Sequence, residues 1–223
     1  MMRKSAPFRF GSISAQPPMA ARGQRIGLFG GSFNPPHEGH KLVSEIALRR
    51  LGLDQLWWLV TPGNPLKGKS ELAALAERIE ACRNLADDAR VVVTDFETGL
   101  PTAYTAATLT FLKMRYPDTQ FVWVMGADNL PRFHRWQQWR EIFAAMPIAV
   151  VDRPGWHLKA IASKAALAYR AARWPERRAA GLAGAAPPAW TLLTGPLSDL
   201  SSTALRAAGL TAASPPRRPM RKR

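Results

Sequence analysis

Short apolar runs alternate with longer segments of helical periodicity between residues 25 and 210. The runs are rich in β-branched and aromatic residues and end near Gly, Pro or polar residues, which is typical of buried strands. We predict strands at residues 26–29, 55–61, 91–94, 120–125, 148–151 and 190–194. Apolar residues at helical spacing predict helices at residues 37–51, 71–86, 104–116, 136–145, 159–173 and 202–208.

This alternation predicts an α/β fold. Strands that are apolar on both sides, each followed by a helix, favour a parallel sheet with helices on both faces. We therefore expect one Rossmann-like domain over residues 25–212. Ligands of such sheets lie beyond the carboxyl ends of the strands, near a topological switch point. The loops after the first, fourth and sixth strands are thus the places where chemistry is expected.

Three segments fall outside the alternation. Residues 1–24 mix Ser, Pro, Gly and Arg without periodicity, which predicts a disordered basic extension. Residues 213–223 predict a basic tail. Residues 174–189 are rich in Pro, Ala, Gly and Arg, and we expect a loop or a poorly ordered insertion there.

The charge of the chain is strongly positive but unevenly placed. The formal net charge is +15, and residues 1–25 together with 215–223 supply ten of these charges without any acidic residue. A basic surface favours anionic partners such as nucleotides through long-range attraction. We interpret the charged ends as solvated tails and expect no nucleic-acid partner.

The apolar runs also bear on the compartment. None approaches the roughly 20 residues needed to cross a bilayer, and no secretory signal is recognisable. The single cysteine, Cys82, cannot form an internal disulfide and indicates no cysteine metal site. We expect a cytoplasmic protein without a membrane partner. A homo-oligomer stays open as an alternative to a monomer.

The loop after the first strand carries the clearest candidate chemistry. It reads GGSFNPPHEGH from residue 30 to residue 40. The two glycines permit a backbone close to a ligand, and the helix start offers unpaired N–H groups and a positive dipole end. His37 and His40 lie on one face of that helix, where two imidazoles can donate hydrogen bonds to a triphosphate, more strongly when protonated. Gly39 would leave room for a base or ribose between them.

A second candidate lies near the end of the domain, where residues 200–206 read LSSTALR. Hydroxyl groups at a helix N-terminus cap the helix or bind phosphate. Arg206 would stand one turn into the helix, where its planar fork of donors could reach an anion. Taken alone, the segment is better explained as an ordinary cap followed by a solvated arginine.

With these two motifs the chain resembles the HxGH nucleotidylyltransferase superfamily. GGSFNPPHEGH resembles the nicotinate/nicotinamide-nucleotide adenylyltransferase branch, and LSSTALR resembles its ISSTxIR motif, with Leu200 and Leu205 in place of isoleucines. The resemblance implies a Rossmann-like fold and a Mg²⁺-dependent attack of an acceptor 5′-phosphate on the α-phosphorus of ATP, without a covalent enzyme intermediate. It implies that His37 and His40 are catalytic. The implied contacts of ATP and its phosphates are Gly30, Gly31, Ser32, Phe33, Gly39, Lys67, Ser201, Ser202, Thr203 and Arg206.

Three further segments resemble the branch where it binds its acceptor. AYTAATL, ending at Leu109, resembles SYTxxTL, which implies that Thr105, with Tyr104 as neighbour, supplies donors to a pyridine carboxylate. The pattern from Gly126 resembles GxDxLxxFxxW and implies that Asp128 binds a ribose hydroxyl. Trp136 would stack on the pyridine ring, or else pack in the core beside Trp139 and Ile142. Arg153, in a segment resembling xxRPG, touches a phosphate or holds its loop.

One position departs from the branch. Where many members read PPHK after the second strand, this chain reads Asn64-Pro65-Leu66-Lys67. Lys67 is retained as an expected phosphate contact. Leu66 removes any role for an imidazole at this place.

The resemblance implies transfer of AMP from ATP to a pyridine mononucleotide, with nicotinate mononucleotide as the expected acceptor. Nicotinamide mononucleotide, a pantetheine phosphate or a glycerol phosphate stay open as alternative acceptors. A fragment of a class I aminoacyl-tRNA synthetase also uses His-x-Gly-His, but no KMSKS-like loop is present. A basic RNA-binding module would show an affinity that falls steeply with salt.

Overall fold

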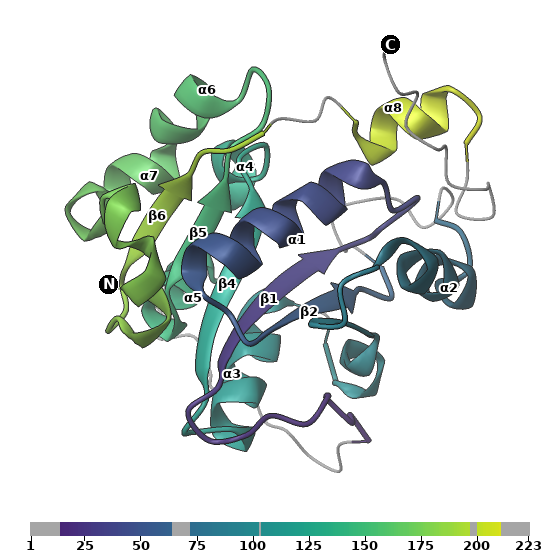
Figure 1. Cartoon of the computed structure of the whole chain (residues 1–223), viewed down its shortest axis with the longest axis horizontal. Helices are drawn as coiled ribbons and strands as arrows, with labels where there is room; N and C mark the ends of the chain where they lie inside the picture. The colour runs from purple at the N-terminus through teal and green to yellow at the C-terminus, as the bar shows by residue number, and fades with distance from the viewer. Residues whose placement is uncertain (1–13, 64–71, 103, 197–199, 211–223) are drawn as a thin grey trace.

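The computed structural model describes residues 14–63, 72–102, 104–196 and 200–210 and contains one six-stranded sheet (Figure 1). All neighbouring strands are parallel, in the order β3-β2-β1-β4-β5-β6. The strands are β1 (Arg25–Gly31), β2 (Gln55–Val60), β3 (Val91–Thr94), β4 (Gln120–Gly126), β5 (Ile148–Val151) and β6 (Trp190–Leu193). This confirms the predicted Rossmann-like α/β fold.

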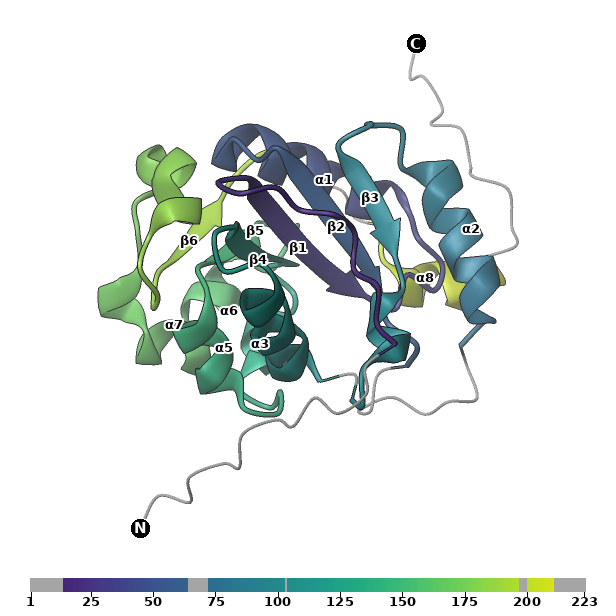
Figure 2. The same cartoon turned by 90° about the horizontal axis from the view of Figure 1, so that it is seen from below.

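Helices cover both faces of the sheet, as Figure 2 shows from below. One face carries α1 (Glu38–Leu51), α2 (Leu75–Leu85) and the 3-10 helix η4 (Glu176–Gly184). The other carries α3 (Thr105–Arg115), α4 (Leu130–Phe133), α5 (Trp139–Ala145), α6 (His157–Ile161) and α7 (Lys164–Ala168). The remaining short elements are η2 (Phe96–Gly99), η3 (Arg170–Ala172) and α8 (Ser202–Ala207).

The two core layers follow from the alternation of side chains along the central strands. Trp57 and Trp58 are adjacent in β2 and both fully buried, because they point to opposite faces of the sheet. Trp57 belongs to the layer under α3 and α5, and Trp58 to the layer under α1 and α2. A strand buried on both faces is apolar at its buried positions, which explains the unbroken apolar run from Leu56 to Val60.

The strand order places a switch point between β1 and β4. β1 pairs with β2 on one side and with β4 on the other, so the chain leaves β1 toward one half of the sheet and returns to build the other. A crevice opens beyond the carboxyl ends of strands at such a point. Figure 1 shows the start of α1 and the short α8 near this edge.

Two of the predicted helices differ in the structure, one because it is divided and the other because it begins later. The segment 159–173 contains α7 and η3 and the end of α6, because the Ser163 side chain accepts a hydrogen bond from the Ala166 amide and so begins a new helix. The helix predicted from Trp136 begins at Trp139, since the preceding Gln138 has φ 53°. Trp136 therefore lies outside a helix. The described part of the segment predicted as a helix from residue 71 forms α2 from Leu75 onward.

Residues 174–189 were expected to form a loop or a poorly ordered insertion, and the structure corrects this expectation. Most of the segment forms η4, whose Ala179 and Leu182 side chains are buried in the layer shared with α1. The Glu176 carboxylate accepts hydrogen bonds from the backbone and hydroxyl of Thr194 and pairs with Arg50 at 2.7 Å. The small residues of this segment thus allow η4 to pack closely against α1 and the sheet.

The described part of the N-terminal segment lies against the domain. The Tyr116 hydroxyl donates to the Pro18 carbonyl at 2.9 Å, and the Gly23 amide donates to the Asp118 carbonyl at 2.8 Å. A Cβ atom at Gly99 would lie 2.5 Å from the Ala15 backbone, so glycine allows this close approach. The composition of residues 1–24 predicted a disordered extension. In the structure, these contacts hold residues 14–24 against the domain. Residues 1–13 and 211–223 lie outside the described residues.

The helices of the described residues are too short or too polar to cross a membrane.

The packing of η4 can be tested by truncating one side chain. We expect Leu182→Ala to lower the free energy of unfolding by about 2 to 5 kcal/mol, because the fully buried side chain would leave a cavity. Leu158→Ala, at a position that is 74% exposed, is the matched control and should change it by less than about 0.5 kcal/mol. Urea denaturation of both variants measures the difference. Equal stability of the two would contradict the assignment of η4 to the core.

Candidate active site

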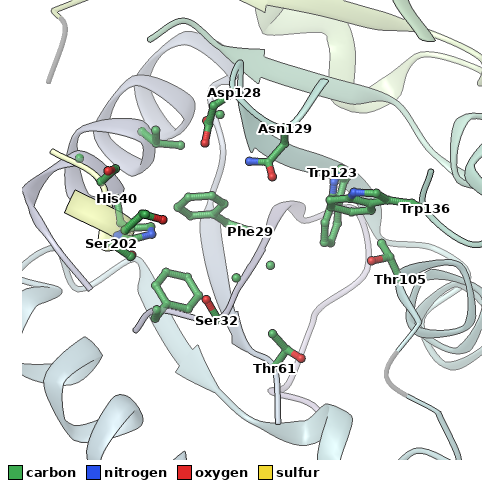
Figure 3. Close-up of a pocket in the computed structure, with 18 of the residues that line it drawn as sticks. Phe29, Ser32, His40, Thr61, Thr105, Trp123, Asp128, Asn129, Trp136 and Ser202 are labelled. Carbon is green, nitrogen blue, oxygen red and sulfur yellow. The ribbon is translucent and has the colours of Figure 1, made fainter. Parts of the chain in front are cut away.

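A cavity of about 430 Å³ opens at the carboxyl edge of the sheet (Figure 3). Its walls come from the ends of β1, β2 and β4, from the loop after β5, and from the start of α8. It is therefore located at the switch point. Most site residues expected from the sequence line it, namely Gly30, Gly31, Ser32, Phe33, His37, Gly39, His40, Tyr104, Thr105, Asp128, Trp136, Arg153, Ser201, Ser202 and Thr203.

The turn after β1 is shaped by two close approaches. A Cβ atom at Gly30 would lie 2.5 Å from the ring of Trp123 on the neighbouring β4, so only glycine lets that ring lie across β1. Phe33 takes a positive φ of 46°, and its buried ring stacks on Trp58 at 5.0 Å. The loop is thereby anchored to the core layer beneath it.

The two histidines cap the first turn of α1. His37 is the N-cap, and its Nδ1 accepts a hydrogen bond from the Gly39 amide at 3.1 Å. Nδ1 of His40 accepts from the His37 amide at the same distance, which completes a capping box. A nitrogen that accepts carries no proton, so each neutral ring carries its proton on Nε2. Each imidazole is thus fixed as an Nε2–H donor by the backbone of its own helix.

The surroundings of the histidines keep both rings neutral. Burial lowers the pKa of His37 to about 4, and the positive charge of Arg153 adds to the shift. Burial, with the neighbouring His37 and Arg153, holds the pKa of His40 well below its ordinary value. The two ring centroids lie 3.9 Å apart, which disfavours two positive charges side by side. At neutral pH the free site therefore presents neutral imidazoles, whereas the sequence left the protonated form open.

Gly39 has a packing role in the structure. A Cβ atom there would lie 2.9 Å from the ring of His37 and 3.3 Å from the carbonyl oxygen of Leu200. The glycine lies in the cavity wall, and the space next to it is shared with these two groups. The lack of a side chain at Gly39 therefore lets the segment before α8 pack closely against the start of α1, and it also leaves space for a ligand.

The late Ser-Ser-Thr segment meets the histidine loop across the cavity. The Ser202 hydroxyl donates to the Pro35 carbonyl at 2.9 Å, and Nη1 of Arg206 donates to the Asn34 carbonyl at 2.6 Å. Ser201 caps α8 by accepting from the Ala204 amide. Arg206 is not among the residues that line the cavity, so in this structure it holds the loop. The segment nevertheless brings both phosphate motifs of the sequence to one cleft.

Arg153 connects three parts of the site. Its guanidinium pairs with the Asp128 carboxylate at 3.3 Å and donates to the Leu200 carbonyl. The side chain is only 17% exposed, so its charge acts in a poorly solvated place. The other oxygen of Asp128, Oδ1, is buried and has no hydrogen-bond partner within the described residues. The loops after β4 and β5 and the start of α8 are thus held by one side chain.

The opposite end of the cavity is aromatic. Figure 3 shows Trp123, Trp136 and Thr105 together, away from His40 and Ser202. The rings of Trp123 and Trp136 meet edge to face with centroids 6.2 Å apart, and Trp136 is only partly buried. Trp139 turns away to pack on Phe143 and Tyr169. Trp136 therefore combines contact with the core and a place in the cavity wall.

Comparisons with known proteins show the family of this chain. A family model described as cytidylyltransferase-like matches residues 28–208. The probable nicotinate-nucleotide adenylyltransferase of Agrobacterium fabrum is 60% identical over 181 residues, covering 81% of this chain and 97% of that protein. The protein of the same name from Rhizobium meliloti is 60% identical over 183 residues, covering 82% and 97%. The chain belongs to the nicotinate-nucleotide adenylyltransferase family.

A solved structure shares the fold of this adenylyltransferase family member. The nicotinic acid mononucleotide adenylyltransferase of Plasmodium falciparum complexed with NaAD superposes with a TM-score of 0.64. The match covers 82% of this chain and 83% of that one at 15% sequence identity. It supports the Rossmann-like architecture independently of sequence.

Several cavity residues of this family member escaped the sequence analysis. Trp123 belongs to an apolar strand and was indistinguishable from a core residue, although Gly30 on the paired strand was a signal for it. Glu97, Thr61 and Asn129 also line the cavity. Each follows the carboxyl end of a strand, which is the one signal that could have found them. Lys67 lies outside the described residues.

The double role of His37 gives a sharp prediction. Asparagine is a strong N-cap, so His37→Asn should retain the hydrogen bond to the Gly39 amide while removing the Nε2–H donor. We expect adenylyl transfer to fall by about 100-fold or more in kcat, with the free energy of unfolding changed by less than about 1 kcal/mol. Steady-state kinetics and urea denaturation measure the two effects. His37→Ala is the control, since it loses the cap as well. A folded His37→Asn variant with normal turnover would show that the imidazole serves the helix alone.

Proposed function

We propose that this chain transfers AMP from ATP to nicotinate mononucleotide, giving nicotinate adenine dinucleotide and pyrophosphate in NAD biosynthesis. The relatives from Agrobacterium fabrum and Rhizobium meliloti carry the name of this activity. The observation that carries the proposal is the single cavity whose two ends differ. One end holds two neutral imidazole donors at a helix start, and the other holds two tryptophans beside Thr105.

The histidine end suits a triphosphate. The Nε2–H groups of His37 and His40 and the N-terminus of the 14-residue helix α1 offer donors and a positive dipole end. The Thr203 hydroxyl makes no hydrogen bond within the described residues and can donate from the other wall. Arg153 adds a positive charge that an incoming phosphate would share with Asp128.

The reaction follows from this placement. An oxygen of the acceptor 5′-phosphate attacks the α-phosphorus of ATP and forms the new P–O bond. The bond from the α-phosphorus to the oxygen bridging to the β-phosphorus breaks, and pyrophosphate leaves with the electron pair. Negative charge grows on the bridging oxygen, where fixed N–H donors stabilise it most. The protein therefore works by positioning the reactants and stabilising charge.

Magnesium enters this proposal as part of the ATP substrate. Mg²⁺ binds phosphate oxygens and keeps several waters, so a protein site of its own is not required. The described residues contain no group of three His, Cys, Asp or Glu side chains placed to hold a metal ion. A magnesium ion bound with ATP would lower the negative charge that the imidazole donors of His37 and His40 must stabilise.

The aromatic end suits a pyridine nucleotide. Trp136 offers a large ring face to a planar heterocycle. Thr105 is the first residue of α3 and Tyr104 its N-cap, and this cap makes no side-chain hydrogen bond. The amides at this helix start are therefore donors for the substituent of the ring. Asp128 lies between the two ends, where its carboxylate would accept a hydrogen bond from a ribose hydroxyl.

The function is tested by pyrophosphate release from ATP and Mg²⁺ with a panel of acceptors. The panel holds nicotinate mononucleotide, nicotinamide mononucleotide and phosphopantetheine. We expect the highest kcat/KM with nicotinate mononucleotide, and chromatography should identify nicotinate adenine dinucleotide as the product. A preference for phosphopantetheine, or no turnover with either pyridine nucleotide, would refute the proposal.

The stacking role predicts a selective defect. Trp136→Ala should raise the KM for the pyridine nucleotide about tenfold while changing the KM for ATP by less than about twofold, because one stacking contact is worth about 1 to 3 kcal/mol. Trp136→Phe is the matched control, since it retains an aromatic face and should show a smaller increase. Steady-state kinetics with each substrate varied in turn measure both constants. Equal increases for the two substrates would contradict stacking on the acceptor.

A further inference from the structure

Glu97 is a buried acid in the cavity wall that the mechanism above does not use. It lies in η2, directly after β3, and is 7% exposed. Acidic side chains are almost never buried to this extent unless they are paired. Within the described residues Glu97 forms no salt bridge. A buried carboxyl group facing a ligand cavity without a cationic partner is typical of a functional group.

Its hydrogen bond places Glu97 at the acceptor end. The Thr108 hydroxyl donates to Oε1 of Glu97 at 2.6 Å, and Thr108 is fully buried. Thr108 follows Thr105 by one turn of α3, so the carboxyl group lies beside the helix start assigned to the pyridine substituent. Oε2 makes no hydrogen bond in the described part of the chain. Since Glu97 lines the cavity, Oε2 is the oxygen available to a bound ligand.

The surroundings make this carboxyl group titrate near neutrality. Burial raises the pKa of Glu97 to about 7, opposed by the hydrogen bond from Thr108. The charged or titratable groups nearest in sequence or sharing the cavity are Asp95, His37, His40, Tyr104, Asp128, Arg135 and Arg153. None of them contributes to the shift. The protonated and ionised forms are therefore both populated at physiological pH.

We propose that the carboxyl group of Glu97 contacts the substituent on the acceptor's pyridine ring and sets the choice between a carboxylate and a carboxamide. This inference rests on the proposed function, because it assigns a contact within the same reaction. The protonated carboxyl donates its O–H to the carboxylate of nicotinate. The ionised carboxyl repels that carboxylate and accepts an N–H from the carboxamide of nicotinamide. Glu97 is thus a specificity-determining residue.

The test is the ratio of kcat/KM for nicotinate mononucleotide to kcat/KM for nicotinamide mononucleotide as a function of pH. Both acceptors have the same ribose and 5′-phosphate and use the same ATP, so the titration of those groups cancels in the ratio. Because kcat/KM reports the free enzyme, the ratio should fall as pH rises through the pKa of about 7. The fall approaches about 100-fold between about pH 6 and about pH 9 if only the protonated form accepts nicotinate and both forms accept nicotinamide equally.

Glu97→Gln removes the titration and retains the shape. The amide can donate to a carboxylate and accept from a carboxamide, so both acceptors should be used, with a ratio that no longer depends on pH. A purely structural role of Glu97 would change both acceptors equally and leave the pH dependence of the ratio unaltered. A ratio in Glu97→Gln that follows the wild-type curve overturns the proposal.

Thr108→Val provides a second, independent variant in which Glu97 stays in place. In the wild type, the hydrogen bond from Thr108 lowers the pKa of Glu97. Removing it in Thr108→Val should therefore raise this pKa and move the fall of the ratio to higher pH. Thr110→Val is the matched control on α3, since the Thr110 hydroxyl donates to the Ala106 carbonyl and has no contact with Glu97. An unchanged transition in folded Thr108→Val overturns the proposal even if Glu97→Gln fails to fold.

Failure of this inference is distinguishable from failure of the proposed function. If wild-type protein releases no pyrophosphate with either pyridine nucleotide, the proposed function itself fails. If it uses them and the ratio is the same at every pH in wild type and variants, only the role of Glu97 fails.

Discussion

The site depends on one arrangement, the capping of α1 by its own pair of histidines. Each Nδ1 accepts a backbone amide, so each ring is fixed both in orientation and in tautomer. Burial and Arg153 then keep the rings uncharged, which lets them lie 3.9 Å apart without repulsion. The two imidazole donors proposed to bind the triphosphate are thus held by interactions that the helix start requires in any case.

Arginines that donate to carbonyl groups stabilise the surrounding loops. Arg78 is 1% exposed, and its guanidinium donates to the carbonyls of Ser32, Thr61 and Ala73. Arg206 does the same for Asn34. Within the described residues neither one is paired with a carboxylate. Their hydrogen bonds hold the loops after β1 and β2 while their positive charges remain unneutralised beside a cavity assigned to polyphosphate.

The sequence predicted the features that are encoded locally. Apolar runs located every strand, and GGSFNPPHEGH located the histidine loop, because strand periodicity and turn chemistry depend on neighbours in the chain. The features that the sequence did not predict depend on residues far apart in the chain. The role of Trp123 is set by Gly30 across the β1–β4 pair, and that of Glu97 by Thr108 on another element. The alanine-rich η4 looked disordered because burial by the sheet and α1 is invisible in its composition.

The contrast between the two ends of the cavity explains how one set of phosphate-binding groups can be combined with different acceptors. The histidine end is proposed to bind phosphate groups that every ATP-dependent transfer shares, and such contacts would carry no information about the acceptor. At the other end, stacking on Trp136 accepts any planar ring of suitable size. Discrimination between rings that differ in one substituent must therefore come from buried polar atoms, since leaving such an atom unpaired costs more than losing an apolar contact. Among the cavity-lining residues that the structure describes, Nε1 of Trp123 and Oδ1 of Asp128 are buried without a hydrogen bond, and the hydrogen bond of Glu97 uses Oε1 and leaves Oε2. The polar atoms that could select the acceptor therefore lie on β4 and in the loops after β3 and β4, separate from the start of α1.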